Sequence, residues 1–244
     1  MNVRRLIRIL GTLMAAGGVL MLVWVLVVWR WQDPFTGVYT RWKQHQLSQS
    51  YQRRVESFAE PRVKKSASLA SSASAIRKQA RRYRLASRRG QAIGRIRVPR
   101  LHLNMVLVDG TDADTLKEGP GLDRRTYMPG EGQLIYVAGH RTTYLAPFAH
   151  IERLRAGDVV SLEVPYATFR YRVFRHRIVP ATDLAVLHSH GRELVELQAC
   201  HPRFFASHRY IAYARLVTVE PRGAPAFAPP ATTVAAAPLA SAQG

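Results

Sequence analysis

Cysteine is almost absent from this sequence: Cys200 is the only one in 244 residues. A single cysteine cannot form an internal disulfide bond, so a disulfide-stabilised scaffold is excluded. It is also a poor basis for a metal site, because structural metal sites take several ligands from one chain. Two interpretations of Cys200 remain: a small buried apolar residue, or a candidate nucleophile that works with a histidine elsewhere in the chain.

Acidic residues are also scarce, with 16 Asp and Glu against 36 Lys and Arg. The imbalance is uneven, because residues 37–90 hold 14 basic and two acidic side chains, whereas residues 91–220 hold 17 and 13. A basic excess of this size is typical of nucleic-acid-binding proteins. Here the basic segment follows a long hydrophobic run, so an anionic membrane or cell-envelope surface is the better partner, and we expect no nucleic-acid binding.

Charge is absent from the 21 positions that follow Arg8 in the apolar run at residues 6–29. That length can cross a bilayer as a helix, and Trp24, Trp29 and Trp31 gather near its end, where tryptophans favour the interface. A cleaved signal peptide is the alternative, but the small-x-small cleavage site is missing. We therefore expect residues 1–36 to form a cytoplasmic tip and an uncleaved transmembrane signal anchor. Basic residues flank the run on both sides, so the positive-inside rule does not decide its orientation.

The segments on either side of residues 91–220 have biased compositions. Residues 37–90 are rich in Ser, Ala, Gln, Arg and Lys, and residues 66–75 (SASLASSASA) have low complexity. This predicts a solvated basic spacer, partly helical, for example at residues 76–89, and partly disordered. The Ala- and Pro-rich tail at residues 221–244 is expected to be disordered.

Short apolar runs with strand-like alternation fill residues 91–220, and Gly, Pro and Asp separate them. This pattern predicts an all-β domain, either a barrel or a sandwich. Only residues 112–117 and 146–155 look helical within it. The expected strands lie at residues 92–98, 103–108, 133–138, 158–164, 169–179, 194–200 and 209–219.

Alternation assigns two faces to the run that contains Cys200. Val195, Leu197 and Ala199 share an apolar face that should pack in the core. Cys200 should therefore emerge on the wetter face, whereas a structural cysteine would fit the apolar face better. If this run and the next are neighbouring strands, Cys200 and Arg209 can point the same way at one end of a sheet.

A thiol needs a base or a charged partner before it can attack a carbonyl group. His140 follows the apolar run at residues 133–138 after a single glycine, and the exit from a strand is a common place for a functional side chain. Arg209 would supply positive charge and forked donors to an oxyanion. The structural alternative for Arg209 is a surface cation or a salt bridge.

No motif predicts a cofactor or a metal site. Asp109, Asp112 and Asp114 invite a calcium interpretation, because clustered oxygen atoms bind hard cations. Their spacing lacks the later bidentate glutamate of an EF-hand. Loop and helix-capping roles therefore explain these carboxylates better.

Three motifs together resemble a sortase: residues 139–148 (GHRTTYLAPF), residues 154–158 (LRAGD), and residues 197–202 (LQACHP) with Arg209. The wider frame fits in the same order, from residues 94–99 (GRIRVP) through 108–111 (VDGT) and 116–121 (LKEGPG) to 128–130 (MPG). The resemblance covers about residues 91–219. Its details are most similar to class E sortases of high-GC Gram-positive bacteria, with class D next.

The resemblance implies an eight-stranded sortase-type β-barrel at residues 91–220, with His140, Cys200 and Arg209 as the catalytic set. It implies that Cys200 cleaves an LPxTG-like or LAxTG-like sorting signal between Thr and Gly. The acyl group would pass to the amine of a cell-wall (peptidoglycan) precursor or a pilin lysine. It also implies that the catalytic domain lies outside the cell membrane.

One position departs from the family pattern. Sortases usually carry threonine directly before the catalytic cysteine, and here the residue is Ala199. The missing hydroxyl suggests an altered donor motif, a slower enzyme or a partial loss of function, and Ala199→Thr should raise turnover if the pocket has room. It also prompts an alternative, in which the chain is a non-catalytic binding or assembly protein on a sortase fold. Because the other three residues are present, we expect an active transpeptidase.

Overall fold

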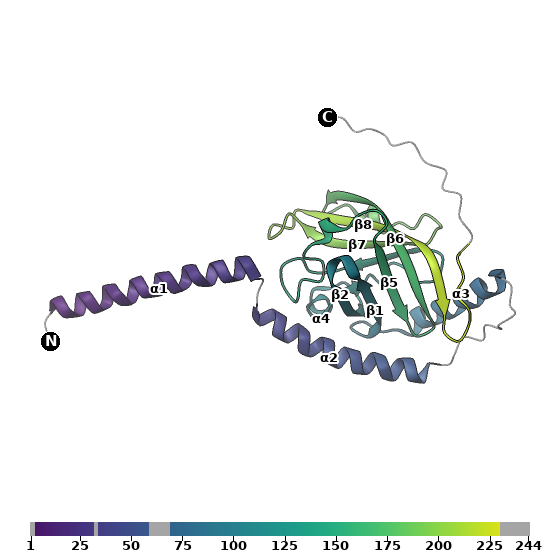
Figure 1. Cartoon of the computed structure of the whole chain (residues 1–244), viewed down its shortest axis with the longest axis horizontal. Coiled ribbons are helices and arrows are strands. Elements are labelled where there is room, and N and C mark those ends of the chain that lie inside the picture. Colours follow the sequence, from purple (N-terminus) through teal and green to yellow (C-terminus); the bar gives the residue numbers. More distant parts are fainter. Residues whose placement is uncertain (1–2, 32–33, 59–68, 230–244) are drawn as a thin grey trace, which may run out of the picture.

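The computed structural model describes residues 3–31, 34–58 and 69–229. Three helices, α1 (Val3–Trp31), α2 (Pro34–Ser57) and α3 (Leu69–Ala86), precede a β-barrel (Figure 1). Eight strands close the barrel in the order β1-β2-β3-β4-β7-β8-β6-β5. The predicted fold class, an eight-stranded barrel with short helices after an apolar N-terminal helix, is confirmed.

Seven of the eight strands coincide with apolar runs predicted from the sequence. The exception is β3, which joins β2 in parallel and β4 in antiparallel pairing. It has only two residues, too few to show alternation. The strands are β1 (Ala92–Val98), β2 (Leu103–Asp109), β3 (Gly121–Leu122), β4 (Leu134–Ala138), β5 (Val159–Val164), β6 (Ala167–Pro180), β7 (Leu194–His201) and β8 (His208–Pro221).

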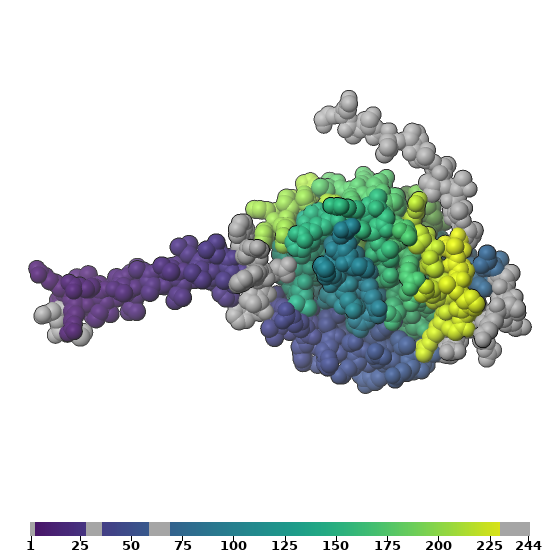
Figure 2. All heavy atoms as spheres, in the orientation of Figure 1, coloured from purple at the N-terminus to yellow at the C-terminus, as the bar shows by residue number. Residues whose placement is uncertain are grey.

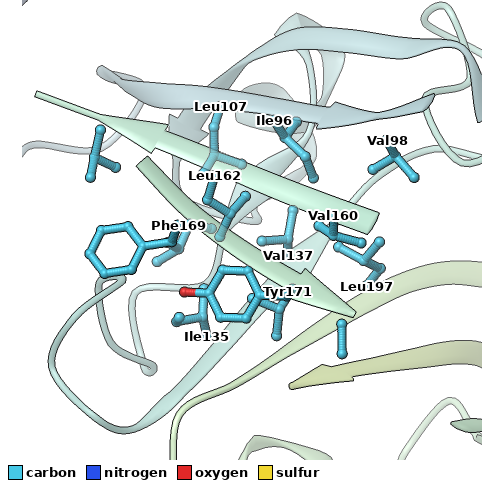
Figure 3. Packing of buried hydrophobic residues seen from close by; sticks show 14 of the residues in the cluster. Ile96, Val98, Leu107, Ile135, Val137, Val160, Leu162, Phe169, Tyr171 and Leu197 are labelled. Carbon is cyan, nitrogen blue, oxygen red and sulfur yellow. The ribbon is translucent and has the colours of Figure 1, made fainter. Parts of the chain in front are cut away.

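Side chains from alternate strand positions fill the interior of the barrel. Figure 3 shows Ile96, Leu107, Val137, Leu162 and Tyr171, which come from five different strands and lie in the same core. All five are fully buried. Burial of an apolar side chain of this size contributes about 1.5–3 kcal/mol, so this core fixes the strands whose ends carry the site.

The prediction of a helix at residues 146–155 is wrong. The segment consists of turns and one short 3-10 helix, η2 (Ile151–Arg153). Pro147 disfavours helical backbone in the residue before it, and Ala146 adopts a φ of 38°. The helical spacing still marks the buried side, because Phe148, Ile151 and Leu154 all lie in the core.

Helix α4 (Ala113–Glu118) forms where residues 112–117 were expected to be helical. Asp112 is its N-cap, and its side chain accepts a hydrogen bond from the Thr115 backbone N–H at 3.1 Å. N-capping of this kind contributes about 1 kcal/mol to a helix. A helix-capping role for this carboxylate, rather than calcium binding, is therefore what the geometry supports.

The segment expected to be a solvated spacer is instead largely packed on the barrel. In α2, Tyr51 is buried and donates a hydrogen bond to the Glu163 carbonyl at 3.1 Å. In α3, Ile76 and Tyr83 are buried in the barrel's own core cluster. The composition of the segment does not reveal these contacts, because only every third or fourth residue of each helix faces the barrel and the others are mostly polar. Residues 59–68 lie outside the described part of the chain.

The two ends of the described chain differ in their packing. In α1, residues 3–26 are all exposed, and Val3–Val27 is long and apolar enough to cross a membrane. Figure 2 shows α1 as a rod that projects from the barrel. At the other end, Phe227 pairs with Val219 of β8 through two backbone hydrogen bonds of 2.9 Å. The start of the tail that we expected to be disordered is thus paired with the barrel, and residues 230–244 lie outside the description.

Candidate active site

The three residues predicted from the sequence line one cavity of about 290 Å³. His140 follows β4, Cys200 lies near the end of β7, and Arg209 lies at the start of β8. The sheet brings them together because β7 lies between β4 and β8. Residues from three separate parts of the sequence thus meet at one end of the barrel wall.

Cys200 and Arg209 are direct partners in the antiparallel ladder of β7 and β8. Directly opposed residues project from the same side of a sheet, with Cβ atoms about 4.5–5.5 Å apart. Val195 and Leu197 are fully buried in the core, whereas Cys200 is half-buried on the other face. The face assignment made from alternation is therefore confirmed.

Ala199 faces away from the cavity. It is fully buried in the barrel core and does not line the cavity to which Cys200 contributes. A threonine hydroxyl at this position would extend into apolar packing. An added hydroxyl at position 199 would therefore face the core and not the cavity, so the rise in turnover expected of Ala199→Thr has no support in this geometry.

His140 reaches the cavity through a short hydrogen-bonded exit from β4. The Gly139 N–H donates to the Gln198 carbonyl at 3.1 Å and extends the pairing of β4 with β7 by one residue. The Phe148 N–H then donates to the His140 carbonyl at 3.1 Å. The imidazole lies 5.1 Å from the Tyr144 ring, measured between centroids.

The surroundings of the imidazole favour its neutral form. His140 Nε2 is buried and has no hydrogen-bond partner among the described residues. Burial lowers the pKa of His140, because removal from water penalises the charged ring. A neutral imidazole has a nitrogen that can accept a proton, as a general base must.

Gly139 is required by close packing beside His140. A Cβ atom at this position would lie 2.7 Å from Phe148 Cδ2 and 2.9 Å from Pro147 Cγ. Both distances are shorter than a normal carbon–carbon contact. The absence of a side chain therefore lets the loop fold back over the end of β4 and fixes the position of His140.

The Arg209 side chain is held by the loop between β7 and β8. Its Nη1 donates to the Ala206 carbonyl at 2.7 Å and to the His208 carbonyl at 3.0 Å. Ala206 has a φ of 55°, so the loop turns sharply beside the guanidinium group. A guanidinium group fixed in this way presents its charge to the cavity with little rotamer freedom left to lose.

The model of the sortase domain family matches residues 96–217, which is half of the chain. The chain belongs to the sortase family. Sortase D of Bacillus subtilis (strain 168) is 34% identical over 133 residues, which are 53% of this chain and 66% of that protein. Sortase SrtE1 of Streptomyces coelicolor is 25% identical over 156 residues, which are 54% of this chain and 42% of that protein. The match thus spans just under two thirds of the first relative and less than half of the second.

Solved structures agree with this fold. A sortase D5 transpeptidase from Clostridium perfringens superposes with a TM-score of 0.58 at 19% identity, over 72% of this chain and 98% of that one. Sortase E from Streptomyces avermitilis gives a TM-score of 0.50 at 28% identity, over 57% and 97%. The relatives include both classes, D and E, that the sequence resembles.

Arg141 is a residue of this sortase whose position the sequence did not reveal. Its guanidinium group is nearly buried and makes three contacts at once. Nη1 lies 3.1 Å from the Cys200 carbonyl and 3.0 Å from His201 Nδ1, and Nη2 donates to Glu152 Oε2 at 2.8 Å. Burial opposes ionisation of Glu152, but hydrogen bonds that include this one lower its pKa. Arg141 therefore ties the loop after His140 to the backbone of Cys200.

The rest of the cavity is lined by both polar and apolar residues. Among the polar lining residues, Thr111 and Arg125 both donate hydrogen bonds to the buried Asp123. Burial opposes ionisation of Asp123, but these hydrogen bonds outweigh it and lower its pKa. An apolar lining beside the Cys200 thiol suits a ligand with aliphatic side chains. The apolar lining residues are Leu116, Ala138, Ala181, Leu184, Val186 and Leu187.

Glu196 lies on the same side of β7 as Cys200, between two tyrosines of the neighbouring strands. It is the ladder partner of Tyr136 in β4 and of Tyr213 in β8. Its side chain is buried, and its Oε2 has no hydrogen-bond partner among the described residues. Burial raises the pKa of Glu196 to about 8, although Arg175 and Arg177 act in the opposite direction.

Proposed function

We propose that this sortase is a membrane-anchored cysteine transpeptidase. It cleaves an LPxTG-like or LAxTG-like sorting signal between Thr and Gly and transfers the acyl group to the amine of a peptidoglycan precursor or a pilin lysine. The observation that carries the proposal is the pairing of Cys200 with Arg209 at the cavity that His140 also lines. A thiol, a base and a fixed cation on one cavity wall are the groups that acyl transfer requires.

The proposed reaction has two halves. In the first, His140 takes the proton of Cys200, and Sγ attacks the threonine carbonyl carbon. Arg209 stabilises the oxyanion, and His140 returns the proton to the glycine amine as the C–N bond breaks. In the second, the acceptor amine attacks the thioester carbonyl carbon and gives a proton to His140. The C–S bond then breaks, and His140 passes that proton to Cys200 Sγ, which restores the thiol.

The alternative of a non-catalytic assembly protein rested on Ala199. Because Ala199 faces the core, its missing hydroxyl removes nothing from the cavity wall. The partly exposed thiol and the buried neutral imidazole support an enzyme instead.

We also propose that α1 remains attached and holds the catalytic domain at the outer face of the cell membrane. Support comes from residues 3–26, which are exposed although most of them are apolar. In a bilayer these apolar side chains would contact lipid instead of water, and the helix would satisfy its own backbone hydrogen bonds. N-terminal sequencing of the mature membrane-bound protein tests this proposal, and a start near residue 33 or later would show cleavage.

The catalytic proposal is tested by peptide cleavage. Cys200→Ala should abolish cleavage of a fluorogenic sorting-signal peptide and leave the circular dichroism spectrum unchanged. Arg209→Lys keeps the charge but loses the planar fork, so single-turnover acylation should slow by about 10²–10³. Arg215→Lys is the matched control, because it lies on the same strand and is exposed.

Cleavage retained by Cys200→Ala would refute the assignment of the nucleophile. An unchanged acylation rate in Arg209→Lys would show that another donor holds the oxyanion. Equal loss in Arg215→Lys would show that the slower acylation comes from a general effect of replacing guanidinium groups on β8, not from a specific role of Arg209.

A further inference from the structure

Helix α2 has an exposed face with two different halves. Its buried side packs on the barrel through Thr40, Leu47 and Tyr51. On the opposite side, the first half is apolar and aromatic, with Val38 65%, Tyr39 40% and Trp42 55% exposed. From position 45 to the end of α2 the exposed residues are all polar: His45, Gln46, Gln49, Gln52, Arg53, Glu56 and Ser57.

The apolar half is the half nearest to the proposed membrane anchor. α1 ends at Trp31 and α2 begins at Pro34. Three residue steps span at most about 11 Å, so the first turn of α2 stays close to the end of α1. Tyr39 and Trp42 follow about 8–12 Å further along the helix axis. The apolar face therefore lies where the chain emerges from the bilayer.

The chemistry of this face is that of a membrane interface. Trp and Tyr favour the headgroup level, where their rings are buried and their polar atoms remain hydrated. Lys43 Nζ lies 5.6 Å from the centroid of the Trp42 ring and 5.9 Å from that of the Tyr39 ring, and Arg41 is exposed beside them. Lys43 is also ion-paired with Glu118 at 2.9 Å, so Arg41 is the basic side chain of this face that can attract anionic lipid.

We propose that the first half of α2, through Val38, Tyr39, Arg41 and Trp42, docks on the anionic outer leaflet of the membrane that α1 crosses. This inference rests on the proposed anchoring by α1. It requires α2 to incline toward the bilayer, because a helix that ran straight outward would carry Trp42 beyond the headgroup layer, which is about 5–8 Å thick.

Docking also orients the cavity. The loop between β7 and β8 lies at the same end of the barrel as the start of α2 (Figure 1). This loop carries Phe204 and Phe205, which are 61% and 82% exposed, and joins the strand ends that hold Cys200 and Arg209. A docked α2 therefore brings the end of the barrel that carries Cys200 and Arg209 close to the membrane surface, where a membrane-held substrate would meet it.

Fluorescence quenching by lipids with brominated acyl chains tests the docking in the full-length protein. The protein is reconstituted into vesicles of phosphatidylcholine and phosphatidylglycerol. Trp24, Trp29 and Trp31 are replaced by Phe, so that Trp42 is the only tryptophan. The matched control carries the same three Phe replacements together with Trp42→Phe and Gln49→Trp. Its only tryptophan then lies two turns further along the same exposed face of α2. A third protein keeps only Trp24 and reports on α1.

We expect bromine to quench Trp42 and Trp24 strongly and the probe at position 49 weakly. Quenching of Trp24 without Trp42 would overturn the docking and leave the anchoring intact. No quenching of Trp24 would overturn both. Equal quenching at positions 42 and 49 would overturn the restriction to the aromatic half. Equal quenching of Trp42 in vesicles with and without phosphatidylglycerol would overturn the preference for anionic lipid.

Discussion

Replacing Glu196 with glutamine should make the stability of the barrel less dependent on pH. The glutamate is buried, and burial raises its pKa to about 8 from an ordinary value of 4.5. Between these values the folded chain holds a proton that the unfolded chain releases. The free energy of unfolding therefore falls as the pH rises through this window.

The magnitude follows from the size of the shift. Each pKa unit corresponds to about 1.4 kcal/mol, so ionisation of Glu196 costs the folded state at most about 4 kcal/mol between pH 5 and pH 8. Arg175 and Arg177 already lower the pKa and are included in this shift. Glutamine has nearly the same shape and stays neutral, so the cost disappears in Glu196→Gln.

Urea unfolding of the full-length protein in detergent micelles, followed by circular dichroism, measures the effect. The free energy of unfolding of Glu196→Gln should equal that of the unsubstituted protein near pH 5. Near pH 8 it should be larger by at most about 4 kcal/mol. Glu56→Gln, on the exposed side of α2, is the control and should change neither value. Equal pH dependence with and without Glu196 would refute the reasoning, because it would mean that water reaches the carboxylate.

Three further substitutions test how the site is held. Arg141→Lys should slow acylation of Cys200 at least about tenfold, because one ammonium group cannot hold all three partners of the guanidinium in place. Single-turnover kinetics measure this, and an unchanged rate would mean that Arg141 does not position the strand. Gly139→Ala should lower stability by about 1–3 kcal/mol through overpacking against Phe148; urea unfolding that stays unchanged would contradict the close packing. Ala199→Thr should destabilise the barrel by about 1–3 kcal/mol by burying an unpaired hydroxyl, and a rise in turnover would contradict its placement in the core.

Sequence alternation is enough to predict the local part of the site. The period of two places Cys200 opposite the apolar set of β7, and the next run returns antiparallel, so Arg209 falls beside it. His140 is different, because it depends on the parallel pairing of β4 with β7, between runs about 60 residues apart. No local pattern encodes such a pairing, and for His140 the family resemblance carried the prediction.

Contacts made by polar side chains account for most of what the sequence did not reveal. Gln44 in α2 pairs with both the N–H and the carbonyl of Val106, at 2.7 and 3.1 Å. Arg141 and Glu152 pair at 2.8 Å across a loop that was expected to be a helix. Hydrophobic periodicity cannot report hydrogen bonds of this kind, since exposed and docked polar residues look alike in a sequence.

The ladder that pairs Cys200 with Arg209 constrains how this sortase can change during evolution. Insertions or deletions in the loop at residues 202–207 can alter its length while the two strands keep their pairing. One residue inserted into β8 after Arg209 would instead force a choice between preserving the core-facing side of the strand and preserving the cavity, because a shift by one position exchanges the two faces. Length variation should therefore gather in the turn, and the eight positions from Leu194 to His201 should accept substitutions but no change in number.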